Sequence, residues 1–424
     1  MKKQILIISD LPVFPANAGN KTRVWAMMKN LQRLGHDVSF LGLGLREEEF
    51  NALRTTWDGN VHNIPALRAR HARPRWFAMK RFLTDRFIAR GIGAPGVDHW
   101  YWPHWDHAIA DFASRHAYDA VMVEYVFFSR ALQQFGTSVC KIIDTHDVYT
   151  GRREKLKARN IKRFYQYLTR SSEEARGLNR ADLVIGIQEN ESCYFRELLG
   201  PSKQVITVGH TVDVQPTPPA ANADILFLGS PYSANVDGVT HFIKNCFPRI
   251  LASVPHARLL LAGSICRNWR HRIAGLVLIG EVENVREAYA QAAVVINPVL
   301  VGTGLKTKTI EALAFGRPLV TTSCGAEGVH DAAGSAFRLA DDPGKFADDV
   351  IQFLTKPDLA AAYAKSAVYF IEQWNNAQLR ALTQVLNTNH EHHTKIPHRP
   401  DLPPQLTTQV GNLCCGSGRQ PAAL

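Results

Sequence analysis

The chain has 424 residues, of which 46% are hydrophobic and 21% are charged. This length is too great for one ordinary hydrophobic core and favours two α/β domains. The composition is that of a soluble globular protein, which excludes a fibrous or wholly disordered chain. The formal net charge of +11 favours an anionic partner, with nucleic acid, anionic lipid and nucleotide-sugar as candidate classes.

Several further classes are excluded by simple patterns. No apolar run approaches the roughly 20 residues of a membrane span, and the apolar stretch after the N-terminal lysines is too short for a signal peptide. The seven cysteines show no C-x-x-C spacing, so reduced thiols and a cytoplasmic location are expected. The histidines between 99 and 107 fit no standard zinc spacing, which favours packing over metal binding.

The N-terminal third begins with a strand–helix–strand pattern. Residues 4–8 are an apolar run, a loop containing Gly19 and Asn20 follows, and an amphipathic segment then leads to a second apolar run at 36–43. Such a βαβ unit opens a doubly wound domain. Further strands are predicted at 118–124, 141–143 and 181–187, with a helix from Glu189.

Two strongly basic segments lie in this half. Between 68 and 90, eight Lys and Arg residues alternate with aromatic and aliphatic residues, and between 152 and 163 seven cations surround one acid, Glu154. Basic amphipathic segments suit the surface of an anionic membrane. The alternative is a solvated helix face with its apolar side in the core. No recognised nucleic-acid module surrounds either segment, so no nucleic-acid partner is expected.

A polar cluster follows the predicted strand at 141–143. Asp144, Thr145, His146 and Asp147 stand just past its carboxyl end, where open α/β sheets bind their ligands. This position makes the cluster a candidate site. The alternative is that Asp144 and Asp147 cap the next helix.

A second α/β unit follows a proline-rich stretch at 209–223. Strands are predicted at 225–228, 259–262, 277–280, 293–297 and 319–322, and helices at 285–292, 309–316, 344–355 and 358–386. From 387 onward the sequence has no periodicity and is expected to be disordered.

The loop between the strand at 293–297 and the next helix has the features of an anion site. Every second residue from 302 to 308 is a glycine or a lysine: Gly302, Gly304, Lys306 and Lys308. In a loop of this kind before a helix, backbone N–H groups and the positive end of the helix would face a ligand. Lys306 and Lys308 add two cations, and Glu311 lies one helical turn further, where its carboxylate can accept bonds from hydroxyls. The alternative is a surface loop with solvated lysines.

The run GTGLKTKTIEALAFGRPLVTT, residues 302–322, resembles the donor-site signature of family 4 glycosyltransferases, which are retaining enzymes of the GT-B fold. Many members carry two glutamates with seven residues between them. The second matches Glu311, but Thr303 stands at the place of the first, so the chain is similar to the branch that reads G-(S/T)-G-x-(K/R)-x-K-x-x-E-A. This departure leaves open the contact to the sugar ring.

Other segments carry the same resemblance. KIIDTHDVYTGRREK, which begins at Lys141, is similar to the acceptor-facing segment, and the loop at Gly19 and Asn20 resembles the glycine loop that faces the donor. Gly229, Ser230 and Asn235 resemble the first loop of the C-terminal domain, and Gly325 and Glu327 resemble a loop beyond the nucleotide, or form a simple turn. A basic pair that many relatives carry near 230–237 is absent.

The resemblance implies two Rossmann-like domains facing a cleft, with residues 1–208 binding the acceptor and 224–360 the nucleotide-sugar. Residues 209–223 would link them, 361–386 would form a helix returning to the first domain, and 387–424 would be the tail. The implied catalytic residues are His146 and Asp147. The implied donor-binding residues are Gly19, Asn20, Gly229, Ser230, Asn235, Gly302, Thr303, Gly304, Leu305, Lys306, Lys308 and Glu311.

The resemblance also implies a reaction: a sugar moves, with retention, from a nucleotide-sugar to a glycan, lipid-linked or other hydroxyl acceptor, in surface polysaccharide or glycolipid synthesis. No D-x-D pair lies in a suitable loop, so no metal or other cofactor is expected. The basic segments would allow peripheral contact with the inner face of the membrane. Two alternatives stay open, namely a GT-B epimerase or hydrolase of nucleotide-sugars and a non-catalytic polyanion-binding protein with a decayed donor site.

Overall fold

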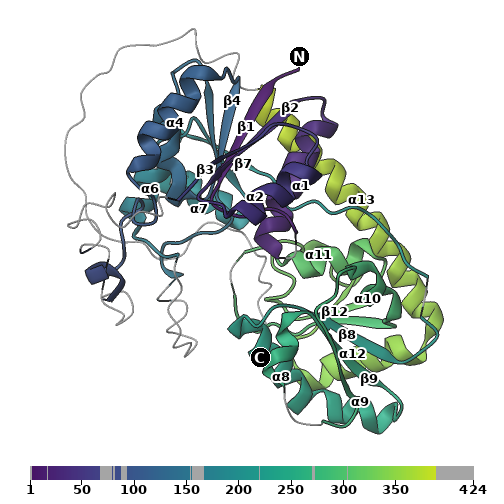
Figure 1. The fold of residues 1–424 in the computed structure, drawn as a ribbon. Coiled ribbons are helices and arrows are strands. Elements are labelled where there is room, and N and C mark those ends of the chain that lie inside the picture. The colour runs from purple at the N-terminus through teal and green to yellow at the C-terminus, as the bar shows by residue number, and fades with distance from the viewer. Residues whose placement is uncertain are drawn as a thin grey trace, which may run out of the picture. The chain divides into compact units, whose positions relative to one another are not determined.

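A computed structural model describes residues 2–16, 18–66, 79, 82–86, 93–152, 154, 167–218, 220–269, 273–302 and 304–387. Two parallel sheets, one of seven strands and one of six, dominate these residues, and helices cover their faces (Figure 1). Both sheets belong to one compact unit that ends at Asn387.

The first sheet has the strand order β3-β2-β1-β4-β5-β6-β7. The chain order reverses between β1 and β4, which is the place where α/β sheets of this kind open a crevice for a ligand. Its strands are β1 Gln4–Ser9, β2 Asp37–Leu43, β3 Val61–Ile64, β4 Ala120–Glu124, β5 Cys140–Asp144, β6 Leu183–Gly186 and β7 Gln204–Thr207.

The helices of this half connect successive parallel strands. The structure gives α1 Gly19–Arg33, α2 Glu47–Thr56, α4 His104–Arg115, the 3₁₀ helix Val126–Gln134, α6 Ser171–Leu178 and α7 Glu189–Leu199. Helix α1 ends where Gly35 takes a φ of 87°, a conformation that glycine adopts without the cost a Cβ would bring.

The second sheet has the order β10-β9-β8-β11-β12-β13, with its reversal between β8 and β11. Its strands are β8 Asp224–Leu228, β9 Arg258–Ala262, β10 Leu276–Gly280, β11 Val294–Asn297, β12 Leu319–Thr321 and β13 Arg338–Leu339. Its helices are α8 Ser233–Asn245, α9 Phe247–Ser253, the 3₁₀ helices Ser264–Asn268 and His330–Ala332, α10 Val285–Gln291, α11 Thr307–Ala314 and α12 Pro343–Thr355.

The central strands are buried on both faces, which explains why they read as unbroken apolar runs. Ile5, Leu6, Ile7 and Ile8 of β1 are all fully buried. Alternate residues of the strand join different clusters, since Leu6 and Ile8 pack on one face of the sheet and Ile5 and Ile7 on the other.

The last helix, α13 Pro357–Asn387, belongs to both halves. Ala367 and Ile371 pack into a core cluster of the second half, whereas Leu382 and Val385 pack into a cluster of the first. Trp374, midway along, donates from Nε1 to the carbonyl of His210 at 2.7 Å. Figure 1 shows this helix running from the second sheet to the first, so the expected return of the final helix is confirmed.

The connection between the halves is held to the protein along its length. Gln215 and Thr217 donate their backbone N–H groups to the carbonyls of Ala314 and Phe315. The side chain of Arg317, 1% exposed, bonds Thr217 and the carbonyl of Pro218. This segment therefore has defined contacts, where its composition suggested only a stiff linker.

The predicted GT-B architecture is confirmed by the two sheets, their orders and α13. Sequence patterns missed the helices α2, α4, α6, α8 and α9 and the strands β3, β7 and β13. The three strands have only two to four residues each. Among the described helices, none combines the length and the hydrophobicity needed to cross a bilayer.

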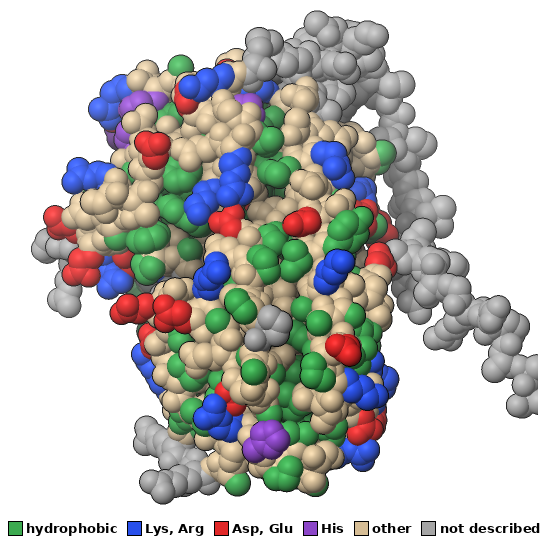
Figure 2. Space-filling model, turned by 90° about the vertical axis from the view of Figure 1, so that its right-hand side faces the viewer, with side chains coloured by type: hydrophobic (Ala, Val, Ile, Leu, Met, Phe, Trp, Pro, Cys, Tyr) green, Lys and Arg blue, Asp and Glu red, His purple; other side chains and the backbone are tan. Residues whose placement is uncertain are grey.

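The two basic segments lie almost wholly outside the described residues: of 68–90 only 79 and 82–86 are described, and of 152–163 only 152 and 154. The expected tail at 388–424 and Thr303 are also outside them. On the face shown in Figure 2, Lys and Arg side chains are interspersed with Asp and Glu side chains.

Candidate functional site

A cavity of 420 Å³ lies where residues of both halves meet. Five residues reach it from the first half, namely Ala16, Ala18, Gly19, Thr22 and Arg152. The segments after β8, β9, β10 and β11 line the rest. These segments follow the carboxyl ends of the strands at and beside the reversal point of the second sheet. The cavity thus occupies the position that the strand order of this sheet favours for a ligand.

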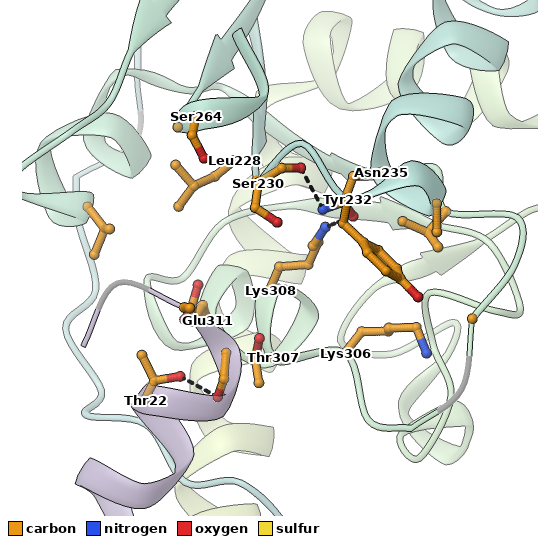
Figure 3. Close-up of a pocket in the computed structure, with 18 of the residues that line it drawn as sticks. Thr22, Leu228, Ser230, Tyr232, Asn235, Ser264, Lys306, Thr307, Lys308 and Glu311 are labelled. Atoms are coloured by element: carbon orange, nitrogen blue, oxygen red, sulfur yellow. Dashed lines mark hydrogen bonds between the residues drawn. The ribbon is translucent and has the colours of Figure 1, made fainter. Parts of the chain in front are cut away.

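The first turns of four helices line this cavity: α1 at Gly19, α8 at Ala234 and Asn235, α10 at Val285 and α11 at Thr307. Figure 3 shows Thr22 entering from α1 opposite the residues of the second half. A helix N-terminus carries unpaired N–H groups and a partial positive charge. Their convergence favours an anionic ligand.

Close packing of α1 on α11 requires Gly19. A Cβ built on this residue would lie 2.9 Å from the hydroxyl of Thr307, closer than Cβ atoms come in proteins. The glycine therefore lets the N-termini of two helices from opposite halves approach each other across the cavity.

Lys308 points into the cavity from the first turn of α11. Its Nζ donates to Oδ1 of Asn235 at 2.5 Å and lies 4.5 Å from the centre of the Phe227 ring (Figure 3). Burial lowers the pKa of this ammonium to about 7. An anion in the cavity would favour the charged form and offset that desolvation.

Glu311 lies one turn further along α11, within the cavity lining. Its Oε2 accepts from the hydroxyl of Tyr289 at 3.5 Å, and burial raises the pKa of its carboxyl to about 7. The carboxyl is positioned to accept a hydroxyl hydrogen bond from a ligand.

Lys306 is held beside the same cavity by groups of its own domain. Its Nζ donates to the carbonyl of Gly304 at 2.5 Å and lies 3.2 Å from Oε2 of Glu327. Gly302 and Leu305 also line the cavity. Lys306 therefore lines the cavity, and the carboxylate of Glu327 neutralises its charge.

The loop after β8 brings three other predicted residues together. Gly229 and Ser230 line the cavity, and the carbonyl of Ser230 accepts from Nδ2 of Asn235 at 3.0 Å. Asn235 therefore links this loop to Lys308, since its other amide atom accepts from the ammonium.

A second polar cluster lies at the carboxyl edge of the first sheet and is almost completely buried. Arg23 of α1, 2% exposed, donates to both carboxylate oxygens of Asp144 at 2.8 and 2.5 Å. His146 Nε2 lies 2.5 Å from Oε2 of Glu124, a fully buried carboxyl at the end of β4. Burial and the neighbouring charge of Asp144 raise the pKa of Glu124 to about 7.

The backbone holds this cluster in an uncommon conformation. Tyr125 and His146 have φ values of 67° and 62°, the left-handed region that residues with a Cβ seldom occupy. Their rings stack at 4.2 Å with 12° between planes. Conformations of this kind cost free energy and gather at functional sites.

Glu124, Asp144 and His146 also form a group whose ligand atoms lie within 4.8 Å of one another, as a metal site would require. However, Arg23 already neutralises Asp144 through a bidentate ion pair, and Glu124 is bonded to His146. The positive charge of the Arg23 guanidinium, bonded to Asp144, would repel a metal cation held by these three residues. The residues fit a hydrogen-bonded network better than a metal centre.

The structure brings together nine of the predicted site residues around the cavity: Gly19, Gly229, Ser230, Asn235, Gly302, Leu305, Lys306, Lys308 and Glu311. His146, Asp147, Asn20 and Gly304 do not line it, and Thr303 is outside the described residues. His146 turns its ring towards Glu124, and Asp147 pairs with Arg152 at 3.4 Å. Asp144 binds Arg23 and so has a role other than helix capping.

The sequence analysis did not predict Arg23 and Glu124 of the buried cluster as site residues. It also did not single out Arg152 and Glu281, which line the cavity. Glu124 could have been noticed as a charged residue that ends an apolar strand run, as Asp144 was. Arg23 carries no such signal, because one arginine in an amphipathic helix resembles any other.

Two family models match the chain. "Glycosyl transferase 4-like domain" matches residues 18–210, and "Glycosyl transferases group 1" matches residues 222–356. A curated relative, an uncharacterized 44.6 kDa protein in the cps region of Klebsiella pneumoniae, is 25% identical over 164 residues. That match takes in 36% of this chain and 42% of the relative.

Solved structures share the fold at low sequence identity. A TarM variant from S. aureus, in complex with fondaparinux, alpha-GlcNAc-glycerol and UDP, is 10% identical with a TM-score of 0.64, over 91% of this chain and 100% of that one. The pneumococcal O-GlcNAc transferase GtfA, in complex with UDP and GlcNAc, is 9% identical with a TM-score of 0.64, over 92% and 99%. Anabaena HepE in complex with UDP is 13% identical with a TM-score of 0.62, over 92% and 100%.

The predicted resemblance is thus confirmed by both family models and by the fold. The chain belongs to the group 1, family 4 glycosyltransferases and has their two-domain GT-B fold.

Proposed function

We propose that this glycosyltransferase binds a nucleotide-sugar in the 420 Å³ cavity and transfers the sugar, with retention of anomeric configuration, to a hydroxyl acceptor. The observation that carries the proposal is the convergence of the N-termini of α1, α8 and α11 and of Lys308 on one cavity between the two sheets. This arrangement offers a diphosphate both N–H donors and positive charge.

Three side chains of the cavity and the start of α11 have roles in this proposal. Lys308 and the N–H groups at the start of α11 bind the diphosphate, and Lys306 joins them by leaving Glu327. Glu311 accepts hydrogen bonds from the ribose hydroxyls. Charge that develops on the leaving phosphate is stabilised by fixed cations and dipoles, so the reaction is proposed to need no metal.

The transfer breaks the bond between the anomeric carbon and the phosphate oxygen and forms a bond from that carbon to the acceptor oxygen. The acceptor proton passes to the leaving phosphate oxygen. We propose that His146 and Asp147, from the opposite half, serve the acceptor side of the reaction, although neither residue lines the cavity. Glu124 keeps the His146 ring in one orientation through its bond to Nε2.

The known proteins suggest substrates to test. UDP occupies the solved structures of TarM, GtfA and HepE, so a UDP-sugar is the first donor to try. The relative in a cps region supports an acceptor that is a glycan or lipid-linked, in the synthesis of a surface polysaccharide or glycolipid. Residues 68–90 and 152–163 would hold the enzyme at the inner face of an anionic membrane.

A donor panel tests the proposal. The melting temperature of the purified chain is measured with UDP-, GDP- and ADP-sugars in buffer without metal, for the wild type and for Lys308→Ala and Glu311→Ala. We expect one nucleotide to raise the melting temperature of the wild type and to have little effect on both variants. The stabilising donor is then incubated with candidate lipid-linked acceptors, and the anomeric configuration of the product is read by NMR.

Two results would contradict the proposal. If no nucleotide-sugar stabilises the wild type, the cavity is not a donor site. If the donor is consumed at the same rate without any acceptor, a hydrolase or epimerase fits better than a transferase.

A further inference from the structure

The start of helix α7 in the first half packs directly against the glycine loop of the second. Ile187 belongs to the same buried cluster as Leu305. Gln188 donates from Nε2 to Oε1 of Glu327 at 3.1 Å. The segment from Ile187 to the first turn of α7 is therefore in contact with the loops that carry Lys306 and Glu327.

Glu191, in the first turn of α7, is the residue of this segment that lies against Gly304. Its side chain is buried, with 5% of the residue exposed. A Cβ built on Gly304 would lie 3.5 Å from Oε1 of Glu191 and 3.9 Å from the carbonyl oxygen of His146. Glu191 thus lies where the glycine loop meets the backbone of the His146 segment.

Two buried polar atoms of this segment have unused hydrogen-bonding capacity. Oε1 of Glu191 accepts from Nε2 of Gln188 at 3.2 Å. Neither Oε2 of Glu191 nor Oε1 of Gln188 has a hydrogen-bond partner among the described residues. A buried polar atom without a partner costs free energy, so such atoms in a folded protein mark the place of a ligand group or a water.

The chemistry of these atoms suits a sugar hydroxyl. Burial and the neighbouring charge of Asp147 raise the pKa of Glu191 well above its usual range. The free carboxyl oxygen of Glu191 and the carbonyl oxygen of Gln188 can both accept hydrogen bonds. A hydroxyl both donates and accepts, so hydroxyls of a sugar ring can satisfy the two atoms.

We propose that Glu191 and Gln188 bind hydroxyl groups of the donor sugar, which gives the first domain a direct part in selecting that sugar. The inference rests on the proposed function, because it places the sugar between the diphosphate site at Lys308 and the His146 segment. Glu191 lies beside Gly304, where the glycine loop approaches the carbonyl of His146.

The test measures the contribution of the sugar to binding separately from that of the nucleotide. Affinities for the nucleoside diphosphate alone and for its sugar conjugate are measured by titration calorimetry for the wild type, Glu191→Ala and Glu191→Gln. The control is Glu189→Gln on the same helical turn, where the carboxylate is exposed and bonds Arg196 at 2.7 Å. Melting temperatures of all variants without ligand report whether the fold is kept.

We expect Glu191→Ala to weaken binding of the sugar conjugate by about 10-fold and to leave binding of the nucleoside diphosphate unchanged. Glu191→Gln should stay within about 3-fold for both ligands, because its amide also donates and accepts. Glu189→Gln should match the wild type.

Other outcomes overturn the inference. Equal weakening of both ligands by Glu191→Ala would mean that the residue only holds the glycine loop in place. Unchanged affinity for the sugar conjugate would mean that Glu191 does not touch the sugar. If the wild type binds the diphosphate, and binds the sugar conjugate no more tightly than the diphosphate, no sugar subsite exists. If the wild type binds neither ligand, the proposed function itself fails.

Discussion

The carboxyl edges of the two sheets carry similar residue types but use them in opposite ways. At the first sheet, Arg23 and Asp144 neutralise each other, and Glu124 and His146 are bonded together in a buried cluster. At the second sheet, Lys308 meets a neutral amide and an aromatic ring and faces an open cavity.

This difference separates two tasks. Charges that are paired and buried fix side chains in one orientation, which suits a group that must be positioned for a reaction. A lysine held by neutral groups in a cavity keeps its electrostatic attraction for a ligand. The comparison therefore assigns positioning to the first half and anion binding to the second.

The largest expected effect is on the buried pair of the first half. Asp144→Asn would leave Arg23 buried without a countercharge, so the free energy of unfolding should fall by about 3–5 kcal/mol in urea titrations. Asp213→Asn, which breaks the exposed pair with Arg33 at 2.7 Å, should cost about 1 kcal/mol or less. Equal effects of the two variants would contradict the structural role given to the buried pair.

The second effect is on ligand binding. Lys308→Met should weaken binding of the nucleoside diphosphate by roughly 10- to 100-fold, since a charge-assisted hydrogen bond contributes about 1.5–3 kcal/mol. The control is Lys244→Met, an exposed lysine at the other end of α8. Calorimetric titration checks both, and equal affinities for the two variants would remove Lys308 from the site.

A smaller effect is expected at Glu124, which in the proposed reaction acts through its bond to His146. Glu124→Gln keeps the shape of the side chain but weakens its bond to Nε2, so kcat should fall by roughly 10-fold while KM for the donor stays nearly unchanged. Initial-rate kinetics separate the two constants. A rise in KM with unchanged kcat would show that the cluster serves donor binding instead of positioning.

The pH dependence of binding reports on Lys308 and on Glu311, whose carboxyl pKa is raised by burial to about 7. The Lys308→Met variant separates the two groups. The pKa of Lys308 is lowered to about 7 by burial, and a bound diphosphate raises it. The protonated form binds more tightly, so affinity should be greatest below pH 7 and fall by up to about 10-fold per pH unit above it, until the pKa of the complex is reached. In Lys308→Met this alkaline decline should disappear, and its persistence would assign it to another group.

The smallest expected effect is that of metal removal. Excess EDTA should leave the transfer rate unchanged, because helix N-termini and lysines stabilise the leaving group in the proposed reaction. Loss of activity that Mg²⁺ or Mn²⁺ restores would contradict this expectation and return attention to Glu124, Asp144 and His146.

Much of the fold follows from sequence patterns. Strands such as β1 and β11 are buried on both faces, so their apolar runs are unbroken and bounded by loops. Helix α2 was missed because its composition is mostly polar and Leu53 is its sole buried residue. Strand β3 was missed because all four of its residues are partly exposed, which leaves no apolar run.

The site was predicted unevenly for a physical reason. Five of the nine predicted cavity residues lie in one glycine loop and the helix after it, so local spacing reveals them. The cluster around His146 joins Arg23, Glu124 and Asp144, which are up to 121 residues apart and meet only when the strands pair. The contact of Glu191 with the glycine loop depends on how two separate sheets come together, which local patterns do not contain.

The most direct test of the account is a crystal structure with the nucleoside diphosphate that stabilises the protein. We expect the diphosphate at the start of α11, within hydrogen-bond distance of Lys308 Nζ, and the ribose at Glu311. Lys306 should have moved from Glu327 to the phosphates. A nucleotide bound elsewhere, or a cavity in which Lys308 still donates only to Asn235, would contradict the central claim.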